Sequence, residues 1–406
     1  MEHPFFVAFV LVSGLALTAA ALKWRWQPTL RTSLIVGIGF RLVVLAFAAA
    51  SSWQPVDFIQ GFQEAGRAAQ SLQDPVLASE GSWHFLPMIP YFYGILLSTG
   101  LPWVIAGRLC TVMADVALIV LVGRLAGPER RAQASFLYAC SPIAVMVAAL
   151  HGQVESIALV FLVGSYLAAR SQRVVAAGVL FGLALSAGSW PVILLPVVLS
   201  MLPTWQQRVR GLIAAGLVPF FFLLSLPIVV HSSWNDMVHV TKYLGGVRPV
   251  VGEWGWTAVM TGGQNILVPG YAKVGQVILY TTLALVAWHW RKADKIDLTS
   301  AMLLAFMLVT PRMGSQYLLW FVPFLCARPT RWSNVAMAAS ALWAGLGYLW
   351  LTQYDDNGWW SHHVYWAQGS TLVIPLLALA MPWYRRVTTP TGPEPLPTER
   401  PVPVAG

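Results

Sequence analysis

The feature that most limits what this chain can fold into is a series of apolar runs, each about as long as a bilayer is thick. Residues 101–122, 212–230 and 268–288 are three of them, and each is close to the ~20 residues that a helix needs to cross a membrane. Only 10% of the residues are charged and 57% are hydrophobic, whereas soluble domains carry about 25% charged residues. The runs lack the alternation of barrel strands, so we expect an all-α, polytopic transmembrane helical bundle.

Basic residues predict how this bundle is oriented, because short cytoplasmic loops are rich in Lys and Arg. Most of the 25 Lys and Arg residues fall in clusters between apolar runs. They predict about 13 crossings of near ~20 residues, with the N-terminus outside and the C-terminus in the cytoplasm. The predicted crossings are 5–22, 31–52, 101–123, 132–150, 154–170, 174–188, 190–203, 211–231, 268–289, 297–310, 315–327, 333–352 and 367–384. Residues 87–99 are short for a span, so we expect a re-entrant or interfacial helix there.

This path predicts one transmembrane domain, residues 1–387, with large extracytoplasmic loops at 51–90 and 231–267. Residues 388–406 are rich in proline and predict a disordered cytoplasmic tail. The net charge of +9 does not indicate nucleic acid, because the basic residues are spread among apolar runs. The three cysteines all fall in apolar segments, where we expect them to pack rather than to form disulfides.

The first large loop contains the strongest candidate for chemistry, Asp57. Residues 57–72 show helical spacing, with one apolar face formed by Phe58, Phe62, Ala65, Ala69 and Leu72. Asp57 and Glu64 share another face, and Asp57 lies just beyond the end of a crossing, at the water boundary. Asp57 followed by Gln60 also fits a capping box. Capping and catalysis are both open for this carboxylate, and the two roles are compatible.

Three further groups of polar residues fall on the predicted outer face. His151, Gln153 and Glu155 form one block, and a His–Glu pair at that spacing suits a metal, a sugar hydroxyl or a buried pair. Lys242 and Arg248 beside Trp254 suit a sugar phosphate, although aromatic residues also gather at any membrane interface. Arg312 lies outside against the positive-inside bias, which indicates an anionic partner or a simply exposed arginine.

Several short motifs, taken together, resemble the GT-C class of polytopic glycosyltransferases, and in particular its bacterial mannosyltransferase-like branch. The residues that carry the resemblance are Asp57 at the start of an amphipathic helix, Gln73-Asp74-Pro75, Trp83-His84-Phe85-Leu86-Pro87, Pro142 with His151–Ser156, Gly252-Glu253-Trp254-Gly255, and Gln316-Tyr317. Two features depart from the pattern: the segment Pro87–Pro90 lacks adjacent prolines, and no second acidic residue stands within two positions of Asp57. The second departure leaves metal dependence open.

The resemblance implies a GT-C-like fold and the transfer of a hexose, mannose by analogy, from a polyprenyl-phosphate donor. The acceptor would be a lipid-linked molecule or a glycan outside a bacterial plasma membrane, with membrane lipids around the enzyme. Asp57 would act as general base. Lys242, Arg248 and Arg312 would bind the donor phosphate, and the substrate would contact Glu64, His84, His151, Gln153, Glu155, Trp254, Gln316 and Tyr317. No metal site is assigned, although a divalent metal stays open as a cofactor.

Two other classes of protein compete with this interpretation. A transporter or lipid flippase would place charges near the midplane of the membrane, as Arg108 and Asp115 suggest. A scaffold without catalytic activity is the other. The acidic loop around Asp57 has no obvious role in either.

Overall fold

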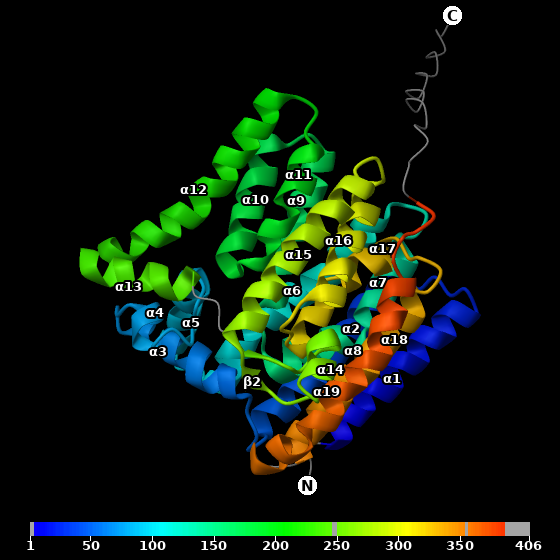
Figure 1. Ribbon diagram of the computed structural model, residues 1–406, viewed down its shortest axis with the longest axis horizontal. Coiled ribbons are helices and arrows are strands. Elements are labelled where there is room, and N and C mark those ends of the chain that lie inside the picture. The colour runs from blue at the N-terminus through cyan, green and yellow to red at the C-terminus, as the bar shows by residue number, and fades with distance from the viewer. Residues whose placement is uncertain (1–3, 246–249, 354–355, 386–406) are drawn as a thin grey trace, which may run out of the picture.

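The structure is a computed structural model that describes residues 4–245, 250–353 and 356–385. Over these residues the chain is almost entirely helical, apart from one pair of two-residue strands (Figure 1). The all-α class is therefore confirmed. Arg248 and the predicted tail, 388–406, lie outside the described residues.

The helices follow one another with short connections, and two π-helical segments (η1, η2) and two 3-10 segments (η3, η4) are part of the series. The first half of the chain contains α1 (Pro4–Lys23), α2 (Leu30–Ala50), η1 (Phe58–Gln63), α3 (Glu64–Gln70), α4 (Pro75–Ala78), α5 (Met88–Ser98), α6 (Trp103–Ala126), α7 (Arg131–Ala139), α8 (Pro142–Val145), η2 (Met146–His151), α9 (Glu155–Arg170), α10 (Val174–Ala187), η3 (Trp190–Leu194) and α11 (Leu195–Ser200). The second half contains α12 (Trp205–Val229), α13 (Trp234–Gly245), β1 (Val250–Val251), α14 (Gly255–Met260), β2 (Ile266–Leu267), α15 (Pro269–His289), α16 (Lys295–Val309), η4 (Ser315–Leu319), α17 (Val322–Ala327), α18 (Ser333–Gln353) and α19 (Asp356–Leu379).

The described residues include five helices that are long and apolar enough to cross a membrane. They are 5–23, α2, α6, α12 and 333–352, and α7 with α8–η2, bent by 51°, makes up to six. Other predicted crossings are shorter: α9 has 16 residues, α10 has 14 and α16 has 15. The predicted crossing at 190–203 is broken into η3 and α11 around two prolines, and each proline removes a backbone donor. The described helices therefore include five, or at most six, candidate crossings of full length rather than about 13.

Helix α5 behaves as its sequence predicts. It has 11 residues, so at 1.5 Å per residue it is about half as long as the bilayer core is thick. It packs against α3, where Gly66 faces the Cβ of Tyr93 so closely that an added Cβ would lie 2.9 Å away. The first loop thus folds as a small helical unit beside the bundle rather than as another crossing.

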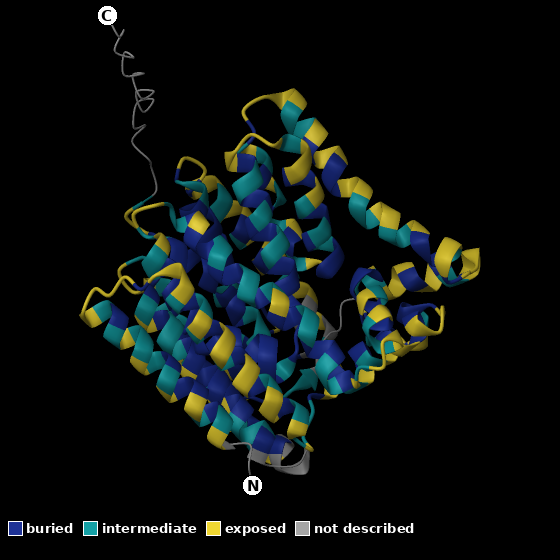
Figure 2. Cartoon of the chain, turned by 180° about the vertical axis from the view of Figure 1, so that it is seen from behind, coloured by how far each residue is buried: buried dark blue, intermediate teal, exposed yellow. Residues whose placement is uncertain are grey.

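Small residues bring neighbouring helices of the bundle close together, as is usual in membrane proteins. A Cβ added at Gly178 of α10 would lie 2.4 Å from the carbonyl oxygen of Gly211 in α12, and Gly182 meets α12 in the same way. The outward side of α12 carries exposed apolar residues such as Leu217, Phe221 and Ile228 (Figure 2). An exposed apolar face of this size fits contact with lipid.

The charges inside the bundle are paired. The guanidinium of Arg41 lies 2.6 Å from Oδ2 of Asp115, and both side chains are 0% exposed. Asp115 also accepts hydrogen bonds from Tyr138 (2.5 Å) and Ser156 (3.3 Å). Arg108 has different partners, so the two charges that share one face of α6 do not contact each other. The Arg41–Asp115 pair ties α2 to α6.

Candidate active site

Asp57 lies where the chain leaves α2 and turns into the first-loop helices. Its carboxylate accepts a hydrogen bond from the backbone N–H of Phe58 at 2.9 Å, so it stands at a helix start without forming the predicted capping box. Phe58, Phe62, Ala65 and Ala69 are buried, which confirms the predicted apolar face, while Leu72 lies beyond the helix and is exposed. That face packs on Trp83 and Trp103 within the protein. The packing fixes the helix, and with it the position of the Asp57 side chain.

The carboxylate of Asp57 is held by side chains from the His151 block. Its Oδ1 lies 2.9 Å from Nε2 of His151, and its Oδ2 accepts a hydrogen bond from the amide of Gln153. Nδ1 of His151 in turn lies 2.7 Å from the hydroxyl of Tyr348 in α18. The Asp57 side chain is 46% exposed and that of His151 is 13% exposed. The site is thus a fixed carboxylate that still faces open space.

Gly152 allows this pair to form. It follows η2 with φ at +77°, a conformation that glycine adopts without strain. A Cβ there would lie 2.7 Å from the ring of Phe58 and 3.1 Å from Arg108. The chain can therefore turn sharply after His151 and bring Gln153 back to Asp57 only because residue 152 has no side chain.

Arg108 of α6 joins the two segments that carry Asp57 and His151. Its Nε and Nη2 donate to the carbonyl of Leu150 at 3.1 and 2.8 Å, and Nη2 also donates to Oε1 of Gln54 at 2.8 Å. The guanidinium lies 4.2 Å from the centre of the Phe58 ring. One buried cation thus contacts residues directly before His151 and on both sides of Asp57, so we assign Arg108 a positioning role.

The surroundings of Asp57 favour its charged form. Burial would raise the pKa of this carboxyl, but the nearby His151 charge and the hydrogen bonds from His151, Gln153 and the Phe58 amide outweigh burial and leave the pKa below its usual value. The group is therefore ionised at neutral pH and ready to accept a proton.

Glu155 lies close behind this pair but is enclosed. It is 6% exposed, and its Oε2 is buried without a hydrogen-bond partner in the described part of the chain. It begins α9, within electrostatic range of Asp57. No hydrogen bond joins it to His151, so these two residues do not form the buried pair that their spacing allowed.

A polar cavity of about 280 Å³ contains the other group of predicted residues. Arg312, Gln316 and Tyr317 line it, together with Glu253 and Asn265. Tyr317 lies within electrostatic range of both Asp57 and Glu155. Tyr348 connects the two places, since its hydroxyl bonds His151 and lies 3.5 Å from Oγ of Ser315. The structure therefore brings the Asp57 pair and the Arg312 cavity into one region.

Four of the predicted residues that the structure describes lie elsewhere. Glu64 and His84 are exposed on the first loop, and His84 contacts Ser82 and Phe85. Lys242 is exposed on α13, which packs on α4 and α12, and it does not line the Arg312 cavity. Trp254 is 0% exposed, and its Nε1 donates to the carbonyl of Met307 at 2.6 Å. The prediction that Trp254 binds substrate finds no support in this placement, because its ring is part of the core.

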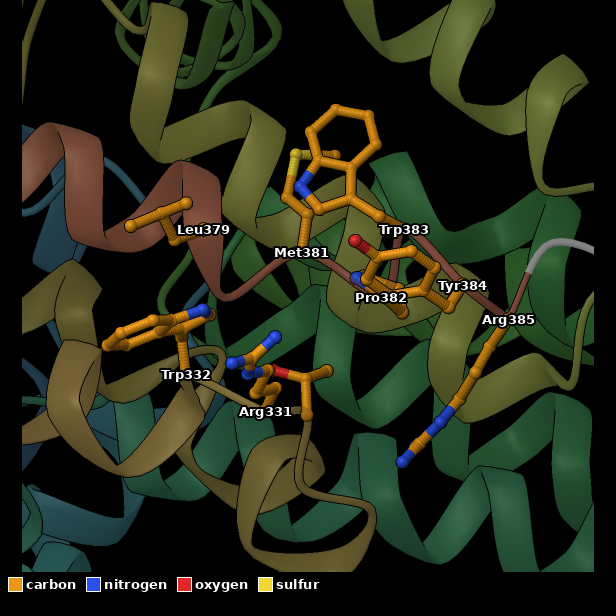
Figure 3. Close-up of a pocket in the computed structure, with 9 residues that line it drawn as sticks. Arg331, Trp332, Leu379, Met381, Pro382, Trp383, Tyr384 and Arg385 are labelled. Atoms are coloured by element: carbon orange, nitrogen blue, oxygen red, sulfur yellow. The ribbon is translucent and has the colours of Figure 1, made fainter.

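A second cavity, of about 260 Å³, contains none of the predicted site residues. It is lined by Thr330, Arg331 and Trp332, which directly precede α18, and by residues that follow α19, among them Trp383 and Arg385 (Figure 3). Arg331 and Arg385 fall in basic clusters, from which the sequence predicts the cytoplasmic side. The lining shares no residue with that of the Arg312 cavity.

Within the ranges that the structure describes, no three His, Cys, Asp or Glu side chains are grouped so that they could hold a metal ion. His151, the best single ligand in the site, uses one ring nitrogen towards Asp57 and the other towards Tyr348.

Taken together, the fold and the site define a class: an integral membrane protein built of helices, with an ionised carboxylate beside a polar cavity. A family model supplies the identity, since the model of glycosyltransferase family 87 matches residues 87–311, more than half of the chain. The chain belongs to glycosyltransferase family 87, and it is a membrane glycosyltransferase. No curated protein matches the chain.

The match confirms the resemblance to polytopic membrane glycosyltransferases. His151, Gln153 and Glu155 fall inside the matched range, as does Arg108. Asp57 precedes the range, and Arg312 and Gln316 follow it. The roles of these residues therefore rest on the geometry of this chain.

Proposed function

We propose that this glycosyltransferase moves a hexose, mannose by analogy, from a polyprenyl-phosphate donor to a lipid-linked or glycan acceptor. The reaction would take place on the extracytoplasmic face of a bacterial plasma membrane, with the N-terminus outside. The observation that carries the proposal is the half-exposed, ionised carboxylate of Asp57, held by His151 and Gln153 next to the Arg312 cavity.

Asp57 would act as the general base in a single displacement. Its carboxylate takes the proton from the acceptor hydroxyl, because a neutral hydroxyl is a poor nucleophile. The hydroxyl oxygen forms a bond to the anomeric carbon while the bond from that carbon to the phosphate oxygen breaks, so the configuration inverts. The products are the glycoside, the polyprenyl phosphate and a protonated Asp57, which returns its proton to water.

Arg312 is the candidate that would stabilise the leaving phosphate. Its guanidinium makes no hydrogen bond or salt bridge with any described residue, yet it lines the cavity beside Tyr317. A free guanidinium facing a cavity suits an anion whose charge grows in the transition state. Gln316 and Tyr317 would contact the same donor, while Glu155 and His151 would lie nearer the acceptor. Arg248, which lies outside the described residues, would be a further phosphate-binding cation, and Glu64 and His84 would contact the acceptor at the first loop. Lys242 is exposed on α13 and does not line the cavity, so its binding to phosphate stays a prediction.

The experiment compares Asp57→Asn with Glu80→Gln, a matched acidic residue on the same loop. Purified variants are incubated with radiolabelled polyprenyl-phosphate sugars and membrane lipid acceptors. We expect Asp57→Asn to reduce transfer by roughly 10²-fold to 10⁴-fold, the size of a general-base contribution, and Glu80→Gln to behave like the wild type. Full activity of Asp57→Asn would remove the assignment.

The transporter alternative gains no support from the charges within the bundle. Arg41 and Asp115 neutralise each other at 0% exposure, and Arg108 is bonded to Gln54 and Leu150. A transport path needs ionisable groups that face a water-filled cavity, whereas these three groups are enclosed by the protein.

A further inference from the structure

The Arg312 cavity contains more hydrogen-bonding groups than a phosphate can use. Four side chains line it without a hydrogen bond to any residue that the structure describes: Glu253, Asn265, Arg312 and Gln316. At about 280 Å³, the cavity is close to the lower end of the ~300–1,000 Å³ typical of ligand pockets. It is also much larger than the roughly 30 Å³ that one water occupies.

Two of these side chains present acceptor oxygens that no described donor satisfies. Oδ1 of Asn265 is buried without a partner, and Glu253, which is partly exposed, presents a carboxylate. A buried acceptor without a donor, as at Asn265, is rare in native proteins and calls for a missing ligand or water. A phosphate has no donors to offer at neutral pH, and its charge would repel Glu253. The hydroxyl groups of a sugar are donors, so this side of the cavity fits a sugar ring.

The electrostatics of Glu253 agree with a site shared between a sugar and a phosphate. Burial raises the pKa of Glu253, although the positive charge of Arg312 acts in the opposite direction. No salt bridge joins the two residues. Glu253 therefore does not neutralise Arg312 by direct contact, and each group stays available to a different part of a ligand.

The backbone holds these groups in place before any ligand binds. β1 and β2 pair antiparallel, with Val251 opposite Ile266, which places Glu253 and Asn265 at the same end of the strand pair. Gly252 has φ at +120°, and a Cβ there would lie 1.9 Å from the carbonyl oxygen of Gln264. Only glycine fits at this position, so the tight pairing that brings the two acceptors together is built into the sequence.

We propose that Glu253 and Asn265 bind hydroxyl groups of the transferred sugar and so determine which hexose the enzyme accepts. Arg312 binds the phosphate of the same donor from the other side of the cavity. The inference rests on the proposed polyprenyl-phosphate donor, and it adds a sugar-reading site to the one that binds phosphate.

The test measures equilibrium binding and needs no transfer. The probes are a short-chain polyprenyl phosphate without sugar and the same lipid carrying mannose, glucose or galactose, added to the full-length protein in detergent. We expect the wild type to bind at least one sugar-bearing lipid more tightly than the bare lipid phosphate. Glu253→Gln, which keeps the size of the side chain, and Asn265→Ala should each reduce that preference about tenfold, the loss expected for one hydrogen bond to a charged or buried group. Neither variant should bind the bare lipid phosphate more weakly than the wild type, because neither removes a donor to the phosphate and Glu253→Gln removes a repulsion.

Arg312→Gln is the matched comparison, because it should weaken binding of every probe, including the bare lipid phosphate. Thermal unfolding of each variant shows whether the fold is intact, and the isosteric Glu253→Gln keeps the test valid if Asn265→Ala unfolds. Three results would overturn the inference: a wild type that does not prefer any sugar-bearing lipid, variants that keep the preference, and variants that weaken all probes equally. A failure of Asp57→Asn to stop transfer would overturn the proposed base alone, since the binding result does not depend on it.

Discussion

The two ends of helix α16 differ in how their polar groups are satisfied. At the end near Lys295, Asp297 is 1% exposed and is paired with Arg328 at 2.8 Å and Arg385 at 3.5 Å. Beyond the other end, Arg312 and Asn265 share a cavity in which neither side chain has a hydrogen-bond partner among the described residues. Asp297 and its two arginines satisfy one another and hold their segments together. Arg312, in contrast, is exposed, and the buried Oδ1 of Asn265 beside it is the kind of unsatisfied acceptor that a ligand completes.

The difference separates stability from function. Substitutions at the paired end should lower the free energy of unfolding and leave transfer intact. Those at the unpaired end should stop transfer and leave the fold intact. Each prediction below tests one side of this division.

Among the substitutions that test this division, the largest effect is expected at Arg312. Arg312→Gln removes the cation that faces the leaving phosphate, so we expect transfer to fall by roughly 10²-fold to 10³-fold, as when one preorganised group is removed from a charged transition state. Thermal unfolding should change little, because the guanidinium has no hydrogen bond to a described residue to lose. Initial rates of transfer and unfolding temperatures, measured on the same sample, check the expected loss of transfer and the expected unchanged stability. A variant that unfolds early but transfers normally would reverse the comparison.

The sequence predicts the local part of this site well. Helical spacing places Phe58 and Phe62 on a buried face, which fixes where Asp57 stands. The block from His151 to Glu155 is recognisable because ionisable groups are rare in an apolar chain. Both patterns depend on residues close together in sequence, and local periodicity encodes which face of a helix is buried.

The sequence does not predict the contacts that join distant segments. Tyr348 bonds His151 across 197 positions, and it lies inside an apolar run with no local mark. Arg108 carries a charge that could be noticed, but its partners Gln54 and Leu150 could not be inferred. Trp254 shows the same limit, since nothing in its loop sequence predicts that its ring is 0% exposed and donates to the carbonyl of Met307. Such pairings depend on tertiary packing, which one-dimensional patterns do not contain.

The second prediction concerns His151. His151→Ala removes its charge and its hydrogen bond from Asp57, so the pKa of Asp57 should rise, because both lower it in the intact site. A general base works only when deprotonated, so the acidic limb of the pH profile of kcat/KM should move to higher pH. We expect transfer at neutral pH to fall roughly 10-fold to 100-fold, less than the loss of the base itself.

Tyr348→Phe is the control for this prediction. It removes the hydroxyl that bonds Nδ1 of His151 and leaves the bond from Nε2 to Asp57 in place. The shift of the acidic limb should therefore be smaller than in His151→Ala. Equal shifts in the two variants would show that His151 acts through something other than its contact with Asp57.

The third prediction tests the paired end. Asp297→Asn removes the charge that Arg328 and Arg385 share, so we expect a loss of roughly 1–3 kcal/mol in the free energy of unfolding, the usual value of a hydrogen bond to a charged group. Denaturant unfolding in detergent measures this loss. Transfer by the folded fraction should match the wild type. A fall in transfer without a fall in stability would place Asp297 in the reaction.

The smallest effect is expected at Arg331, the counterpart of Arg312. Both arginines line cavities of similar size, and neither makes a hydrogen bond or a salt bridge with a described residue. The cavities differ in their other polar groups. Arg385 lines the Arg331 cavity (Figure 3) and is paired with Asp297. Thr330, in the same lining, donates to the carbonyl of Ala380. Arg331 lies 5.8 Å from the Trp332 ring, a weak contact at an exposed site.

Arg331→Gln should therefore change the free energy of unfolding by no more than about 0.5 kcal/mol, as surface substitutions do, and transfer should equal that of the wild type. Rates and unfolding curves measured beside those of Arg312→Gln make the comparison direct. If both variants lose transfer alike, then an unpaired arginine in a cavity is enough to mark a functional site. If only Arg312→Gln loses transfer, the acceptors Glu253 and Asn265 beside Arg312 distinguish a binding site from a cavity without a function.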